Sequence, residues 1–154
     1  MDRMTTPPHP SPAATVRRFT RADASWAEGW FADELLDRTL GPYDEEWYTH
    51  VLSDTSGAQL VVEQHDGVVA LVGVAWGEAH EPHVITDLAV NPSRRGEGLG
   101  RVAVGAVRSW PGHPPCAGWL AFVEPENDAA AAFFRALGWT DEGVDDGMRR
   151  FVSA

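Results

Sequence analysis

The segment from Leu88 to Arg101 constrains the fold of this 154-residue chain more than any other stretch. Its first residues are apolar and typical of a strand, which Asn91-Pro92 should end. Three glycines follow at every second position, namely Gly96, Gly98 and Gly100. An amphipathic stripe then continues to Trp110 and indicates a helix. A strand, a glycine turn and a helix in direct succession predict an α/β domain whose turn lies at the N-terminus of that helix.

Such a turn can hold a phosphate group. Glycine lets a ligand approach the backbone closely, and free N–H groups at a helix N-terminus attract phosphate oxygens. Arginine side chains at the turn can add charge-assisted hydrogen bonds. We therefore expect a pyrophosphate site at Arg95, Gly96, Glu97, Gly98, Leu99, Gly100 and Arg101. A plain loop with a helix cap is an alternative, whereas a dinucleotide fingerprint fits poorly because it requires G-x-G-x-x-G in a leading βαβ unit.

The remaining pattern predicts the order β-α-α-β-β-β-α-β-α-β-β, a mixed α/β class with a mixed sheet. Expected strands cover 14–20, 59–65, 68–77, 83–90, 117–123, 139–142 and 148–152. Expected helices cover 23–40, a short stretch near Trp47, 95–110 and 127–137. Residues 1–13 contain four prolines and are expected to form a disordered leader before a single domain over 14–154.

Composition excludes several classes of function. All twelve basic residues are arginine, which excludes lysine Schiff-base chemistry and a Walker A phosphate loop. The formal net charge of −11 disfavours nucleic acid and anionic membranes as partners and favours cationic small molecules. No apolar run is long enough to span a bilayer, and no signal peptide is evident. The single cysteine, Cys116, indicates a reducing compartment, so we expect a cytoplasmic protein.

Two motifs resemble those of the GNAT acetyltransferases. The first is R-x-x-G-x-G at 95–100, preceded by DLAVNPSR, which is similar to the family's coenzyme-A-binding motif. The second, at 127–139, resembles the family's helix that begins at Asn, is rich in Ala and ends in Leu-Gly-aromatic. The similarity extends from about Val16 to Phe151 and includes the expected order of elements. It implies the GNAT acyl-CoA N-acyltransferase fold and transfer of an acetyl group from acetyl-CoA to an amine, without a metal or a covalent enzyme intermediate.

The resemblance also implies roles for individual residues. The end of the expected strand, at Leu88, Ala89 and Val90, would hold pantetheine and the acetyl carbonyl, with a backbone N–H as oxyanion donor. Asn127 would contact the pantetheine arm, although it could also serve simply as a helix N-cap. Phe134 takes the position at which the family often has a Tyr as general acid for the leaving thiolate. One alternative is therefore a CoA-binding module with weak or lost catalysis, and another is a nucleotide-binding regulatory domain.

The group that accepts the amine proton is less narrowly defined. Asp87 precedes Leu88, and period-two alternation places His83 on the same strand face, so both are candidates for a catalytic base. Asp87 could equally anchor a cationic substrate. Glu78, His80 and Glu81 form a polar cluster at the preceding turn. Each of these residues could instead be an ordinary solvated side chain.

The family resemblance implies that the first two helices and their loop build the acceptor pocket. This segment contains aromatic and acidic side chains, namely Trp30, Phe31, Asp33, Glu34, Asp37, Tyr43, Asp44, Glu45, Glu46, Trp47 and Tyr48. Aromatic rings beside carboxylates suit a cationic amine with an apolar part. Core aromatics with a solvated acidic face are the alternative. Seven tryptophans leave room for an exposed apolar patch, so a homodimer stays open as an alternative.

Overall fold

A computed structural model of the chain describes residues 14–33, 44–65, 67–78 and 81–153. Its strands are β1 Thr15–Arg18, β2 Gly57–Gln64, β3 Gly67–Ala75, β4 His83–Val90, β5 Trp119–Val123, β6 Thr140–Asp145 and β7 Met148–Val152. Its α-helices are α1 Ala24–Trp30, α3 Glu45–Ser53, α4 Leu99–Ser109 and α5 Asp128–Ala136, and two short 3-10 turns cover Arg21–Asp23 and Pro92–Arg94. The predicted order of elements is confirmed. The expected leader, 1–13, lies outside the described residues.

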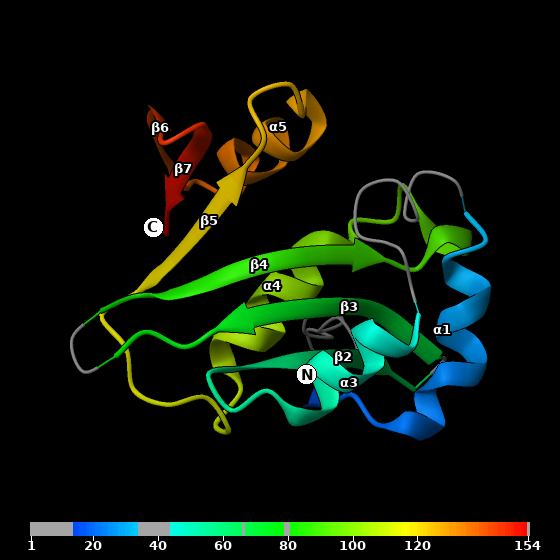
Figure 1. Cartoon of the computed structure of the whole chain (residues 1–154). Coiled ribbons are helices and arrows are strands. Elements are labelled where there is room, and N and C mark those ends of the chain that lie inside the picture. Colours follow the sequence, from blue (N-terminus) through cyan, green and yellow to red (C-terminus); the bar gives the residue numbers. More distant parts are fainter. Residues whose placement is uncertain (1–13, 34–43, 66, 79–80, 154) are drawn as a thin grey trace, which may run out of the picture.

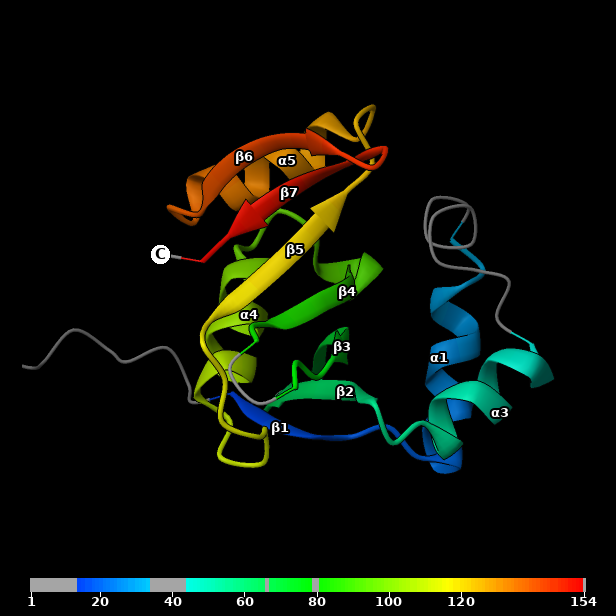
Figure 2. The ribbon, with the colours of Figure 1, turned by 60° about the vertical axis from the view of Figure 1, so that its left-hand side comes forward.

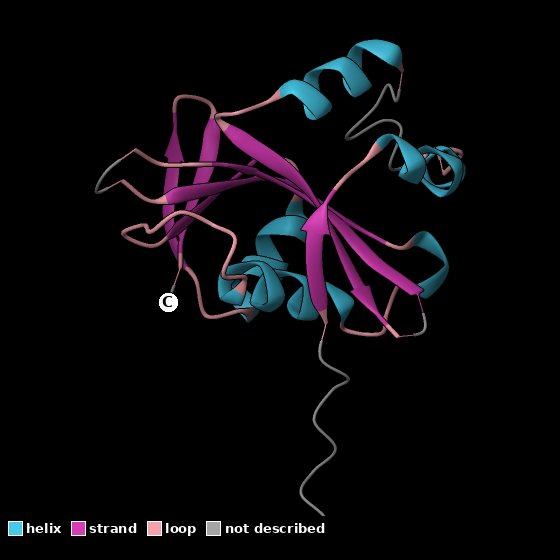
Figure 3. Cartoon of the chain, turned by 90° about the horizontal axis from the view of Figure 1, so that it is seen from below, coloured by secondary structure: helices cyan, strands magenta, loops and turns pink. Residues whose placement is uncertain are grey.

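The strands form one mixed sheet in the order β1-β2-β3-β4-β5-β7-β6. Strands β4 and β5 pair in parallel, and the other neighbouring pairs are antiparallel. Helices cover both faces, with α1 and α3 on one and α4 on the other (Figures 1 and 3). The larger core packs α4 and α5 against the sheet, and a second cluster packs α1 and α3 against the opposite face. The predicted α/β class with a mixed sheet is therefore confirmed.

Strands β4 and β5 diverge after a short contact. Their pairing covers only His83–Ile85 against Trp119–Ala121. Beyond that point β5 turns away from β4 toward α5 and the β6–β7 hairpin (Figures 1 and 2). Within the described part of the chain, the last four residues of β4, Asp87–Val90, thus pair with β3 alone, and their other edge faces a split in the sheet. The glycine turn follows at the open end of this split.

Several predicted boundaries were wrong. The helix expected from residue 95 begins at Leu99, because Gly96 and Gly98 adopt left-handed φ angles of 85° and 75° and extend the turn. Helix α1 ends at Trp30, residues 31–33 form a turn, and the remainder of the predicted 23–40 helix falls outside the described residues. The sixth strand continues to Asp145 rather than ending at residue 142.

Candidate active site

The glycine turn is fixed to the sheet at its start and open at its centre. The Asn91 amide donates to the Val68 carbonyl at 3.0 Å, and its oxygen accepts from the Ser93 N–H at 3.0 Å. A Cβ placed on Gly96 or Gly98 would find no described atom within 4 Å. Among the described residues, no side chain caps the N-terminus of α4, which Gly98 precedes in a left-handed conformation. Side chains therefore leave the turn open in front of the first N–H groups of α4, as an anion site requires.

The last three residues of the motif, at 99–101, contribute to packing between α4, α5 and the core. Leu99 is buried in the core beneath the sheet. A Cβ on Gly100 would lie 2.7 Å from Cε1 of Phe133, so this glycine permits α4 to approach α5 closely. The guanidinium of Arg101 donates to the carbonyl of Ala136 at 2.8 Å, at the end of α5. The contact of these three residues with a phosphate group stays a prediction.

Both arginines before the glycines are paired with carboxylates. Arg95 donates from Nη1 and Nη2 to the two oxygens of Asp33, at 3.1 and 2.9 Å. Asp33 follows α1, so this ion pair joins the end of α1 to the glycine turn. Arg94 lies 3.4 Å from Glu97 through both Nε and Nη2. A phosphate at the turn would consequently meet Arg95 in competition with the Asp33 carboxylate.

Asp87 lies on the α3 face of the sheet because of a bulge in β4. Gly73 of β3 pairs with Asp87, but the next residue, Val74, pairs with Ile85, which leaves Thr86 as an extra residue. The Asp87 carboxylate occupies the space above Gly73, where a Cβ would lie 2.2 Å from Oδ2. Burial raises the pKa of Asp87, while hydrogen bonds from Gln59, the Gly73 backbone and Thr86 oppose that rise.

The predicted shared face of His83 and Asp87 was wrong. The extra residue in the bulge reverses the alternation, so His83 points to the α4 face instead. There its ring contacts Trp76 and Trp119 edge-on and is 0% exposed. Nδ1 accepts from the Gly77 N–H at 2.8 Å, so Nε2, 2.7 Å from the Pro114 carbonyl, bears the proton and donates. His83 thus fixes two backbone segments at the start of β4, away from the split.

The other residues implied by the resemblance line the split or cap α5. Leu88 and Val90 pack toward the larger core, and Ala89 packs toward α1 and α3. Asn127 is the N-cap of α5, where its Oδ1 accepts from the Ala130 N–H at 3.1 Å. Its Nδ2 has no hydrogen-bond partner among the described residues, so the cap leaves a donor for a ligand.

Phe134, at the position of the family Tyr, is buried among other rings. It stacks on Phe151 at 5.6 Å between centroids and lies 5.0 Å from Trp139. A phenyl ring has no proton to give to a leaving thiolate. Its packing shows a role in joining α5 to β7, and its contact with a thioester stays a prediction.

The aromatic residues expected to build the acceptor pocket mostly form core. Trp30 and Tyr48 are buried in the cluster under α1 and α3, together with Phe31 and Trp47 at its edge. Asp44 is the N-cap of α3, and Glu45 pairs with Arg21 at the surface. Glu34, Asp37 and Tyr43 lie outside the described residues, as does His80 of the polar turn, whose Glu78 and Glu81 are exposed.

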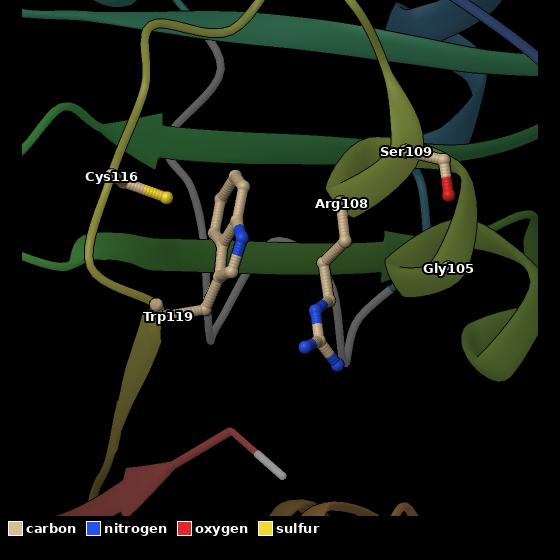
Figure 4. Close-up of a pocket in the computed structure, with 6 residues that line it drawn as sticks. Gly105, Arg108, Ser109, Cys116 and Trp119 are labelled. Carbon is tan, nitrogen blue, oxygen red and sulfur yellow. The ribbon is translucent and has the colours of Figure 1, made fainter.

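Two hollows differ in position and composition. A cavity of about 90 Å³ lies between α3 and the sheet and is lined by Trp47, His50, Val51, Asp54, Ala58, Gln59, Gly73, Val74, Thr86 and Asp87. A shallow hollow of about 500 Å³ lies at the other end of α4 from the glycine turn, beside Arg108, Cys116 and Trp119 (Figure 4). The smaller cavity is the one that adjoins β4 near the split.

One cluster near the larger hollow has the composition of a metal site but not its protonation. Ligand atoms of His83, His113 and Cys116 lie within 4.8 Å of one another. The Gly77 N–H occupies the lone pair of His83 Nδ1, so binding a metal at Nε2 would place two donors face to face. His83 and His113 instead hydrogen-bond to the Pro114 carbonyl in the loop before β5.

In the described residues, no helix is both long and apolar enough to cross a membrane.

Comparison with known proteins identifies the fold independently. A model of the "Acetyltransferase (GNAT) family" matches residues 20–139. The uncharacterized N-acetyltransferase YfmK of Bacillus subtilis is 28% identical over 128 residues, which covers 82% of this chain and 84% of that protein. An acetyltransferase from Thermus thermophilus superposes with a TM-score of 0.72 at 17% identity, over 91% of this chain and 96% of that one. Spermidine N-acetyltransferase from Vibrio cholerae, in complex with CoA and spermine, gives 0.69 at 16% identity, over 92% and 94%.

Proposed function

The chain belongs to the GNAT family of acetyltransferases, and from this membership we propose that it transfers an acetyl group from acetyl-CoA to an amine of a small cationic acceptor. The observation that carries the proposal is the split between β4 and β5, which opens beside a glycine turn at an uncapped helix N-terminus. A free strand edge and a phosphate cradle at its end suit a long ligand that has a pyrophosphate group. Solved neighbours that contain CoA or acetyl-CoA support this assignment.

In the proposed complex, the backbone does most of the binding. The N–H groups around Gly98 would hold the pyrophosphate, and Arg95 would add its guanidinium after release from Asp33. Pantetheine would lie along the open edge of β4 at Leu88–Val90, where it could receive a hydrogen bond from Asn127 Nδ2. An N–H of this edge would donate to the thioester oxygen as charge develops on it.

The proposed reaction is a direct displacement. The lone pair of the neutral amine attacks the acetyl carbonyl, a C–N bond forms, the C–S bond breaks and CoA leaves as a thiolate. A thiol has an ordinary pKa of about 8.5, so the thiolate can leave at neutral pH without an acid at Phe134. The amine proton passes to a base or to water, and the sequence candidates for that base were Asp87 and His83. The His83 ring is buried and hydrogen-bonded at both nitrogens, which favours Asp87 of the two, either as base or as an anchor for positive charge.

A cationic acceptor has independent support. The chain has a net charge of −11, and the cavity beside β4 contains Asp87 and Asp54. Solved neighbours include spermidine N-acetyltransferases, one with spermine bound. These observations favour a small polycation or an amine with an apolar part over a nucleic acid.

Release of free CoA thiol tests the proposal. The full chain is mixed with acetyl-CoA and a panel of cationic, neutral and anionic amines, and thiol formation is followed with a chromogenic disulfide. We expect release that depends on the amine and is fastest with cationic acceptors. If acetyl-CoA binds but no amine releases thiol, the chain is a CoA-binding module without catalysis, which is the alternative that Phe134 suggests. Preference for anionic or neutral amines would refute the cationic acceptor alone.

A further inference from the structure

A polar row crosses three strands on the α3 face of the sheet. Gln59 of β2 pairs with Gly73 of β3, which in turn pairs with Asp87 of β4. Because the middle residue is glycine, the two outer side chains meet above it, and Gln59 Nε2 donates to Asp87 Oδ1 at 3.4 Å. A Cβ at Gly73 would overlap the carboxylate at 2.2 Å from Oδ2. The row therefore depends on glycine at the central strand.

Gln59 is the less expected member of this row. It is 8% exposed on a strand whose neighbouring side chains are apolar. Its Nε2 donates to Asp87, Oε1 has no hydrogen-bond partner among the described residues, and the residue lines the cavity. A buried amide oxygen without a donor costs free energy, so such atoms in native proteins call for an explanation. A ligand with an N–H donor would satisfy it.

The cavity above the row is rich in acceptors. Asp87 has no cationic partner among the described residues, and burial raises its pKa, a cost that a bound cation would offset. Asp54, on the cavity wall, accepts from the N–H and hydroxyl of Ser56, and the hydroxyl bond foremost lowers its pKa. Trp47 and His50 also line the cavity, and an aromatic ring beside a cation can attract it.

The size of the cavity limits what can enter. About 90 Å³ is well below the roughly 300–1,000 Å³ of pockets that enclose whole drug-sized ligands. An unbranched aminoalkyl end fits this description, since it combines three N–H donors, a positive charge and a narrow stem.

The position of the cavity separates it from the reacting centre. The row runs from β4 toward β2, whereas the split lies between β4 and β5, on the other side of β4. Neighbouring strands lie about 4.8 Å apart. An ammonium held between Gln59 and Asp87, above Gly73 of β3, is thus about one strand spacing from β4, so a different nitrogen of the same acceptor would have to reach a thioester in the split.

We propose that this cavity binds a second, protonated primary amine of the acceptor, held by the carboxylate of Asp87 and by Oε1 of Gln59, while another amine of the same molecule is acetylated. The acceptor is then a linear alkyl diamine or longer polyamine whose spacer crosses at least one strand. This inference rests on the proposed acetyl transfer for the reaction, but the binding site itself does not require it. Asp87 becomes an anchor, and Gln59 a residue that determines specificity.

Binding is tested without turnover. Calorimetry measures the affinity of the full chain, with no acetyl-CoA present, for 1,4-diaminobutane. Gln59→Met keeps the length of the side chain but removes the oxygen, and Asp87→Asn removes the charge; both should weaken binding about tenfold or more, as expected for lost hydrogen bonds to a charged group. Gly73→Ala should do the same by displacing the Asp87 carboxylate. The matched control is Glu142→Gln, which removes an equal charge at a surface ion pair with Arg150 on β7 and should leave affinity unchanged.

Turnover gives a second, separable result. Butylamine, with its one ammonium in the cavity, should inhibit acetylation of 1,4-diaminobutane competitively and should itself be acetylated poorly. Gln59→Met should raise KM for the diamine with little change in kcat. The anchor site would be overturned by equal kcat/KM values for butylamine and the diamine. It would also be overturned if Gln59→Met and Asp87→Asn both kept native circular dichroism and unchanged affinity for the diamine. Diamine binding that these variants weaken, in a protein that acetylates nothing, would leave the site standing and refute the acetyl transfer instead.

Discussion

Gly98→Ala separates the two reasons for glycine in the phosphate turn. Gly98 has φ of 75°, and no described atom lies within 4 Å of a Cβ placed there, so the alanine methyl group meets no steric obstacle. Without a ligand, the substitution should lower the free energy of unfolding by about 1–2 kcal/mol, because alanine must adopt the left-handed conformation. Unfolding temperature should therefore fall by roughly 2–8 °C, at about 2–4 °C per kcal/mol for a chain of this size. The methyl group would also stand where phosphate oxygens approach the first N–H groups of α4.

A matched variant isolates the phosphate contribution. Gly143 in β6 has φ of 85° and is equally open, so Gly143→Ala should lose similar stability far from the turn. Only Gly98→Ala should lose acetyl-CoA affinity, by about tenfold to hundredfold, which corresponds to one hydrogen bond to a charged group. Thermal unfolding gives the first quantity and calorimetry with acetyl-CoA gives the second. Equal affinities in the two variants, with both correctly folded, would refute the placement of the pyrophosphate at this turn.

Three further outcomes follow from individual contacts. Burial raises the pKa of Asp87, so the stability that this group contributes is complete below its unfolded pKa of about 3.9 and is lost as pH rises through the folded value. Asp87→Asn should therefore raise the unfolding temperature at pH 7. In a series of thermal unfolding measurements, this gain should shrink toward pH 3.5. Asp33→Asn should release Arg95 and improve the affinity for acetyl-CoA by up to about fivefold, which is the range of a surface ion pair. Weaker binding of acetyl-CoA in calorimetry would show instead that Asp33 orients Arg95. Phe134→Ala should lower the free energy of unfolding by about 3–5 kcal/mol in chemical denaturation, because the ring packs against Trp139 and Phe151. Phe134→Tyr should leave the rate of thiol release similar or modestly faster. An alanine variant identical to the parent in stability, binding and turnover would place Phe134 outside both the core and the site.

Hydrophobic periodicity predicted the order of elements because helices such as α4 bury one continuous face, here with Leu99, Ala103, Val104 and Val107. Strand β4, for example, was predicted over its observed span of His83–Val90, and β7 over Met148–Val152. The ends of helices depend on single backbone angles and were less accessible. The helix was predicted from Arg95, and the left-handed conformations of Gly96 and Gly98 set the start of α4 at Leu99 instead.

The candidate site shows a different limit. Alternation placed His83 and Asp87 on one face, and a single extra residue, Thr86, reverses that assignment. A bulge has no side-chain pattern of its own, so an apolar-polar alternation cannot reveal it. Gln59 was missed because it lies in a β-rich run and has no motif. The signal that could have found it is Gly73 in the middle of a strand, which indicates close approach by a neighbouring group.

In the proposed complex, the geometry of β4 would let one strand serve two substrates at once. In a strand the hydrogen-bonding groups of the backbone lie in the plane of the sheet, and the side chains stand perpendicular to it. The divergence from β5 frees the backbone edge at Leu88–Val90, in the plane, where we propose that the acyl donor binds. The bulge at Thr86 turns Asp87 out of the plane toward α3, where an acceptor amine can be held. Because the two binding modes use perpendicular directions of the same backbone, a change to the Gln59 cavity should alter acceptor choice without altering the affinity for acetyl-CoA.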